Sequence, residues 1–276
     1  MLILSTTKGN VELLGDMNGF DRNRLYLWES ARIIARHFRM KTLPVVVSNA
    51  CISGVAAMLV ARQLIMRGEC DHAIVVGADL VSRFIVSGFQ SFLSLSEQPC
   101  RPFDKDRDGL TLGEAAATAV ISRQYGDIEL VGGATSNDAN HISGPSRTGE
   151  GLLISIRNTM EGQGGIDLIS AHGTATVYND EIESIAISRA GLDHVPVNSL
   201  KGYFGHTLGA AGIVESIINI EAMKQNVLVS TKGYAKLGVS GNIHVVGHSE
   251  QKKIQSMLKI ASGFGGCNAA ALFRKR

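Results

Sequence analysis

A chain of 276 residues with 45% hydrophobic content can bury a large core, as one domain or two packed halves, so a disordered or fibrous protein is excluded. The formal charge of +2, from 27 basic and 25 acidic residues, gives no overall field that would draw nucleic acid or a membrane surface. Any acidic partner must therefore use a local patch.

The four cysteines are widely separated and show neither a CxxC pair nor zinc-ligand spacing, so we expect no metal site and no disulfide framework. The N-terminal run Leu2-Ile3-Leu4 is too short for a signal-peptide core. No apolar segment approaches the roughly 20 residues that span a bilayer. These features predict a cytoplasmic protein.

Short runs rich in Val, Ile and Ala predict strands, each bounded by Gly, Asn or Asp. In chain order they cover 44–50, 72–78, 115–122, 197–200, 243–247 and 257–263. Helical spacing of apolar residues predicts a helix from Ile52 to Arg67, ending at Gly68, and a second from about Ala210 to Lys224. This alternation predicts an α/β fold in layers, with sheets covered on both faces.

Each of the two predicted helices follows a strand and a loop with a candidate catalytic residue, which is a faint internal repeat. Residues 125–151 are rich in Gly, Ser, Asn and Asp, so the junction between the halves is predicted near Gln124-Tyr125. The expected halves are therefore residues 1–124, which carry the candidate nucleophile, and 125–276.

Cys51 follows the predicted strand PVVVSNA and comes directly before a helix of small residues. At a helix N-terminus, unpaired N–H groups and the helix dipole can lower the pKa of a thiol and can stabilise an oxyanion on an attached acyl group. The alternative is a small buried core cysteine, which an isolated cysteine in an apolar run usually is. The rest of the sequence has to decide between them.

His172 lies in the turn AHGTAT after an apolar run, and His206 lies between glycines, five residues after Lys201. Both positions are typical of strand-end loops that present a side chain to a cleft, although turn histidines often only cap backbone. One cysteine, two such histidines and a lysine suit thioester chemistry, with a nucleophile, two donors to a carbonyl oxygen and a cation that orients them. Such a set needs no metal.

The stretches NACISG (49–54), RPFDKDRDGLTLGEAA (101–116), AHGTATVYNDEIE (171–183), SLKGYFGHTLGAAGIVES (199–216) and ASGFGGCNAA (261–270) resemble the β-ketoacyl synthases of the thiolase-like superfamily. They occur in the family's order and cover almost the whole chain. The resemblance implies a layered α-β-α-β-α fold of two similar halves. It also implies decarboxylative condensation of a malonyl thioester with an acyl group, in fatty-acid, polyene or polyketide synthesis.

The resemblance implies that Cys51 carries the acyl group, with His172 and His206 completing the triad and Lys201 orienting His172. Phe264 would act as a gate, and its backbone N–H would join that of Cys51 in an oxyanion hole. A supporting polar network is expected from Asp180, Glu183, Glu215, Thr174 and Thr176. No cofactor is implied. The implied partners are acyl- and malonyl-loaded acyl carrier protein and a second ketosynthase chain, in a homodimer or heterodimer, through the strand before Cys51.

Family members carry roughly a hundred further residues before the segment matching LILSTTKGN, so the N-terminal half is expected to be incomplete, and activity of this chain alone stays open. A non-catalytic chain-length-factor-like partner is the first alternative, although such subunits usually lack the nucleophile that Cys51 provides. A thiolase is the second alternative, because Cys267 stands in a glycine-rich C-terminal loop.

Overall fold

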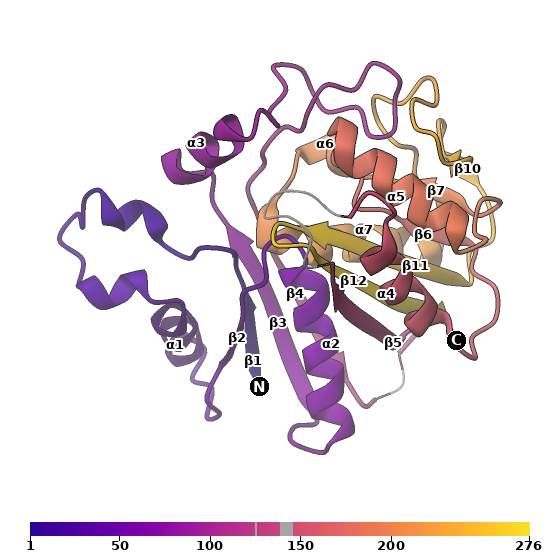
Figure 1. The fold of residues 1–276 in the computed structure, drawn as a ribbon. Helices are drawn as coiled ribbons and strands as arrows, with labels where there is room; N and C mark the ends of the chain where they lie inside the picture. The colour runs from indigo at the N-terminus through magenta and orange to yellow at the C-terminus, as the bar shows by residue number, and fades with distance from the viewer. Residues whose placement is uncertain (125, 139–145) are drawn as a thin grey trace.

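The computed structural model describes residues 1–124, 126–138 and 146–276 (Figure 1). The first of its two large β-sheets has the strand order β2-β1-β3-β4. Three strands run parallel, and the fourth pairs antiparallel with β3. Their bounds are β1 (Leu2–Ser5), β2 (Val45–Val47), β3 (His72–Asp79) and β4 (Ala115–Ser122).

The second sheet has six strands in the order β5-β12-β11-β6-β7-β9. β5 and β12 are joined antiparallel, β12 and β11 likewise, and β11, β6, β7 and β9 are parallel. The bounds are β5 (Ile128–Asn137), β6 (Leu168–Ser170), β7 (Pro196–Asn198), β9 (His244–Val245), β11 (Ser256–Gly263) and β12 (Cys267–Lys275). A separate small sheet pairs β8 (Val227–Leu228) with β10 (Glu250–Gln251).

Helices α2 (Ser53–Met66) and α7 (Ala211–Gln225) lie between the two sheets and contact strands of both (Figure 1). α1 (Leu27–His37) packs on β1 and β2, while α4 (Glu150–Met160) packs on β5 and β12, with α5 (Val177–Arg189) beside it. α3 (Arg83–Ser91) and the short α6 (Lys201–Phe204) complete the set. The predicted α-β-α-β-α layering is confirmed. Among the described residues, no helix combines the length and apolar character needed to cross a bilayer.

The two sheets repeat one topology. The strands β4-β3-β1-β2 have the same order of antiparallel and parallel pairings as β12-β11-β6-β7. α2 follows β2, and α7 follows β7 after the short α6. The chain passes from one sheet to the other between β4 and β5. The predicted junction residue Tyr125 lies outside the described residues, so the division into halves stays a prediction.

Some predicted elements were wrong in extent. The strand predicted at 44–50 ends at Val47, because the following residues form the turn that carries Cys51. Residues 128–137 lie in the stretch rich in glycine and polar residues for which no strand is predicted, yet they form β5. This strand pairs with β12 along nearly its whole length, so tertiary pairing overrides a local composition that is typical of a loop.

α2 and α7 cross in contact at two glycines. A Cβ atom on Gly54 would lie 3.0 Å from the Gly209 carbonyl oxygen and from the Ile213 backbone nitrogen. A Cβ atom on Gly212 would lie only 2.7 Å from the Val55 backbone nitrogen. The helices can approach this closely because neither position carries a side chain. This crossing brings the helix that follows Cys51 against the helix that follows His206.

We predict that Gly212→Ala destabilises the fold by about 1–3 kcal/mol, because the added methyl group forces the two helices apart. Denaturant unfolding measures the change. Gly88→Ala in α3 is the matched control, since a Cβ atom there has no neighbour within 4 Å and alanine is the better helix former. Equal stability changes in the two variants would contradict the close helix contact.

Candidate active site

Cys51 sits in a constrained turn between β2 and α2. The residue before it, Ala50, has a positive φ of 42°, which is strained for a residue other than glycine. Ser53 supports the turn, because its hydroxyl accepts a hydrogen bond from the Asn49 N–H at 2.7 Å and donates one to the Ala50 carbonyl at 2.6 Å. Since α2 begins at Ser53, the sulfur lies beside a helix N-terminus, as the sequence predicted.

The prediction that a position beside a helix N-terminus lowers the thiol pKa of Cys51 is wrong for the resting protein. Burial, followed by the neighbouring Cys267, raises the pKa of Cys51 to about 12. Lys201 and a hydrogen bond from the Phe264 backbone N–H lower the pKa of Cys51 by less. The helix terminus and these groups therefore do not offset the loss of solvent around the sulfur. The thiol is protonated near neutral pH and must give up its proton during the reaction.

Thiolate ultraviolet absorbance tests this state of the sulfur. The difference spectrum between the wild type and Cys51→Ser should show no titration from about pH 6 to about pH 10, because a thiol with a pKa of about 12 stays protonated throughout. A thiolate signal that appears below about pH 8 would mean that Cys51 is ionised at rest.

His172 projects from the turn that follows β6, and two carboxylates of α5 hold that turn. Glu183 accepts hydrogen bonds from the backbone N–H groups of His172 at 2.6 Å and Gly173 at 2.7 Å. Asp180 accepts them from the backbone N–H groups of Thr174 at 3.0 Å and Phe103 at 2.7 Å. Burial and the neighbouring Asp180 raise the pKa of Glu183 to about 7. The α5 carboxylates thus set the backbone from which His172 projects.

His206 faces His172 from the loop between α6 and α7. The centroids of the two imidazole rings are 5.2 Å apart, and the ring planes are nearly perpendicular at 87°. The Cys51 sulfur and one nitrogen from each ring all lie within 4.8 Å of one another. Both ring nitrogens of His206 are buried without a hydrogen-bond partner in the described part of the chain. His206 is therefore free to exchange a proton or to donate to a ligand.

Lys201 is fully buried and contacts His172 through the backbone. Its ammonium group donates to the His172 carbonyl oxygen and to Glu215 Oε1, both at 2.6 Å. Burial raises the pKa of Glu215, but Lys201 and Lys259 together lower it below its ordinary value. Glu215 is therefore ionised and balances buried positive charge.

Both imidazoles are neutral at pH 7. Burial lowers the pKa of His172 and of His206 well below the ordinary value, and the charges of Lys201 and Lys259 lower it further. The same positive surroundings disfavour a metal cation and favour an oxygen atom that becomes negative. Two neutral imidazoles can each donate one N–H to such an atom.

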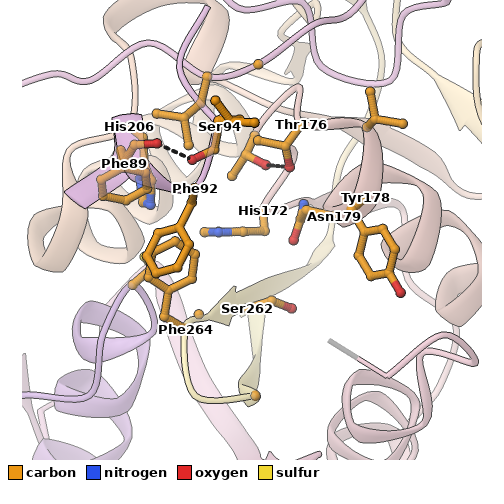
Figure 2. A pocket seen from close by; sticks show the side chains of 18 of the residues that line it. Phe89, Phe92, Ser94, His172, Thr176, Tyr178, Asn179, His206, Ser262 and Phe264 are labelled. Atoms are coloured by element: carbon orange, nitrogen blue, oxygen red, sulfur yellow. Dashed lines mark hydrogen bonds between the residues drawn. The ribbon is translucent and has the colours of Figure 1, made fainter. Parts of the chain in front are cut away.

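A cavity of about 520 Å³ connects these groups to the surface. Figure 2 shows the rings of Phe89, Phe92 and Phe264 gathered on one side of the cavity, with His172 projecting toward them. The Phe264 ring centroid is 5.2 Å from that of Phe89 and 5.2 Å from that of Phe92. The hydroxyls of Thr174 and Thr176 lie 3.0 Å apart and line the same cavity. The cavity thus has an aromatic side and a polar side.

The GFGG loop approaches the nucleophile closely at Gly263. A Cβ atom on Gly263 would lie 3.0 Å from the Cys51 backbone nitrogen and 2.9 Å from the Cys267 sulfur. Cys51, which lines the cavity, and Cys267 are thus neighbours on either side of Gly263. Cys267 itself points toward the Phe264 carbonyl oxygen, at 3.3 Å from its sulfur.

The structure brings together all of the predicted site residues. Cys51, His172 and His206 converge, and Lys201 and Glu215 lie behind His172. Three contributors are not predicted from the sequence: Lys259, the aromatic pair Phe89 and Phe92, and the proximity of Cys267 to Cys51. A lysine inside the apolar run MLKIASG was a usable signal for the first. No sequence signal marked the other two, because they depend on how α3 and the β11–β12 turn approach the cavity.

Comparisons with known proteins agree with this geometry. The model of the beta-ketoacyl synthase N-terminal domain matches residues 28–126, and that of the C-terminal domain matches residues 128–235. The 3-oxoacyl-[acyl-carrier-protein] synthase 2 of Rhizobium meliloti is 34% identical over 253 residues, which are 83% of this chain and 60% of that protein. The putative mitochondrial 3-oxoacyl-[acyl-carrier-protein] synthase of Schizosaccharomyces pombe is 30% identical over 274 residues, 89% of this chain and 64% of that protein.

Among solved structures, a chain from the complex of a ketosynthase with its chain length factor from Xenorhabdus doucetiae is 28% identical, with a TM-score of 0.90. That match covers 100% of this chain and 74% of the other. The chain spans only 60–64% of the length of the two curated relatives, from Rhizobium meliloti and Schizosaccharomyces pombe. With both domain models matched in consecutive order and a thiolase-like fold that superposes over its whole length, the chain belongs to the beta-ketoacyl synthase family.

Proposed function

We propose that this chain is a β-ketoacyl synthase that condenses a malonyl thioester with an acyl group held on Cys51, in fatty-acid, polyene or polyketide synthesis. The observation that carries the proposal is the convergence of the Cys51 sulfur with nitrogens of His172 and His206 within 4.8 Å, at the base of a cavity of about 520 Å³. A nucleophile facing two neutral donors suits acyl transfer followed by enolate formation.

The first step transfers an acyl group to Cys51. The sulfur attacks the thioester carbonyl carbon while its proton moves to one of the neutral imidazoles. The backbone N–H of Phe264, which already points at the sulfur, and that of Cys51 stabilise the tetrahedral oxyanion. The carbon–sulfur bond to the carrier then breaks, and the carrier sulfur leaves as a thiol with that proton.

The second step forms the new carbon–carbon bond. The malonyl carboxylate leaves as carbon dioxide, and its bonding electron pair forms an enolate whose oxygen accepts hydrogen bonds from His172 and His206. The enolate carbon attacks the acyl-Cys51 carbonyl, and the carbon–sulfur bond breaks to release a 3-oxoacyl thioester. The Cys51 sulfur leaves as a thiolate and takes a proton from solvent, which restores the resting thiol. Each buried donor aimed at the enolate oxygen is worth about 3–4 kcal/mol in barrier height.

Intact-mass spectrometry tests the proposal. The chain is incubated with acyl-loaded carrier protein, and then with malonyl-loaded carrier protein, while carbon dioxide release is followed. We expect one acyl adduct that is lost on addition of the malonyl thioester. The adduct should persist in Cys267→Ala and be absent in Cys51→Ala. Absence of both acylation and decarboxylation in the wild type would refute the activity.

The two alternative functions have less support. A chain-length-factor-like role does not require a cysteine and two histidines to converge, yet these side chains do so here. A thiolase would use its second cysteine as an acid or base, but burial raises the pKa of Cys267 to about 11. The imidazoles of His172 and His206 are unprotonated at neutral pH and can accept a proton, whereas the Cys267 thiol already holds one.

Acyl carrier protein and a second ketosynthase chain are the proposed partners. β2 is an edge strand of the first sheet, and its three valines are only half-buried, which supports pairing with a second chain in a homodimer or heterodimer. Light scattering of the purified chain should give a dimer mass, and a monomer at all concentrations would refute a homodimer. The free thiols of all four cysteines support a reducing, cytoplasmic location.

A further inference from the structure

Lys259 is a second buried cation beside the candidate active site. It lies in the middle of β11, in a strand that is otherwise apolar or small, and its side chain is completely buried. A lysine is almost never fully buried without a partner, because its ammonium group loses hydration. Burial lowers the pKa of Lys259, while its contact with Glu215 opposes that change. Packing alone therefore does not explain why a lysine is buried at this position.

The contacts of Lys259 supply that reason. Its ammonium group donates to the carbonyl oxygens of Ser170 at 3.2 Å and Ala171 at 3.0 Å. It also lies 2.6 Å from Glu215 Oε2, while Glu215 Oε1 is 2.6 Å from Lys201. Lys201 in turn donates to the carbonyl oxygen of His172. Two lysines joined by one carboxylate thus bind the carbonyl groups of three successive residues, 170 to 172. The last of these is His172, whose imidazole lies near the Cys51 sulfur.

We propose that Lys259 is a positioning residue of this site, acting with Lys201 through the shared Glu215 to hold the strand end that carries His172 and to set the charge around the two imidazoles. This inference rests on the proposed function for its kinetic readout. Its structural part depends only on the contacts of Lys259. Because β11 pairs with β6 at Lys259 and Ser170, a lysine at this position reaches the end of β6 directly.

The electrostatic part follows from the count of buried charges. The ionisable groups around the two imidazoles come from several elements that pack against the site. They are Cys51 before α2, Asp108 at the cavity, Asp180 and Glu183 on α5, Lys201 on α6, Glu215 on α7 and Lys259 on β11. Two cations share the single carboxylate of Glu215, so one positive charge is not balanced within this group. That charge disfavours protonation of His172 and His206, and it favours a negative enolate oxygen.

Two substitutions separate position from charge. Lys259→Met removes the charge and the donors at similar length, and it leaves Glu215 paired with Lys201. Lys259→Gln also removes the charge but keeps a hydrogen-bond donor on a shorter chain. Lys224→Met, in an exposed pair with Glu221 on α7, is the control for loss of a lysine elsewhere. Thermal unfolding of each variant is recorded alongside.

The kinetic readout is decarboxylation of malonyl-loaded carrier protein, compared with acylation of Cys51. In Lys259→Met we expect decarboxylation to fall by about 100-fold, because a misplaced His172 donates poorly to the enolate oxygen. Acylation should change much less, since the Cys51 proton can pass to His206, whereas the contacts of Lys259 lie at Ser170, Ala171 and Glu215 on the His172 side. Lys259→Gln should retain more decarboxylation activity than Lys259→Met. Equal losses of acylation and decarboxylation would indicate a purely structural role and overturn the inference.

The second readout does not require activity. NMR titration of the imidazole signals, identified by their loss in His172→Gln and His206→Gln, should show that the pKa of both histidines rises in Lys259→Met and in Lys259→Gln. Should the methionine variant not fold, the glutamine variant decides. Unchanged imidazole pKa values would overturn the inference. If instead the wild type neither acylates nor decarboxylates, the proposed function fails while this titration still tests Lys259.

Discussion

Replacing Cys51 with alanine is expected to abolish acyl transfer and to lower the condensation rate by more than about 10⁴-fold, because no other group can hold the acyl chain beside the imidazoles. Decarboxylation of the malonyl thioester should persist at a reduced rate, since both histidines remain in place. Radiolabelled malonyl-loaded carrier protein measures carbon dioxide release and product formation separately.

Cys267→Ala is the matched control for that experiment, since Cys267 is a buried cysteine close to Cys51 across Gly263. Its acylation should remain close to that of the wild type. Acylation that survives in Cys51→Ala and disappears in Cys267→Ala would reverse the assignment of the nucleophile.

Replacing Glu215 with glutamine should destabilise the protein by about 3–5 kcal/mol, because two fully buried lysines then lose their only shared carboxylate. The loss is larger than for an ordinary ion pair, since neither ammonium group can turn toward water. Denaturant unfolding at about pH 7 measures the change. Condensation should fall at the same time, because the two lysines hold the backbone at His172.

A control lies on the same helix. Glu221→Gln removes the exposed pair with Lys224, and exposed pairs contribute at most about 1 kcal/mol. A destabilisation by Glu215→Gln no larger than that by Glu221→Gln would show that the buried lysines do not depend on the carboxylate.

Much of the fold could be predicted from the sequence because its signals are local. The continuous apolar run at 72–78 and the small residues after Cys51 report directly on a buried strand and a packed helix. β5 and β12 escaped prediction, because their glycine, serine and alanine residues form strands only when paired with each other. The protonation state of the Cys51 thiol could not be predicted from the sequence for a similar reason. Its helix position is visible in the sequence, whereas the burial that raises its pKa is a tertiary property.

The site could be predicted as a set of residues but not as a geometry. His172 and His206 stand in recognisable glycine-rich turns, but only the structure shows that they converge on Cys51. Lys259 lies in a strand with no turn or glycine to mark it, and its function depends on which strand lies beside β11. Pairing between distant strands is the information that a single sequence does not display.

The aromatic side of the cavity, formed by Phe89, Phe92 and Phe264, has a practical consequence for redesigning acyl-group selectivity. Gly263 cannot accept a side chain without displacing Cys51, so the backbone of its loop is fixed. Phe89 and Phe92 come from a different segment, α3 and its C-terminal cap, and their rings pack on the ring of Phe264. Engineers seeking to admit bulkier acyl chains should therefore trim these two rings and leave the glycine loop unaltered.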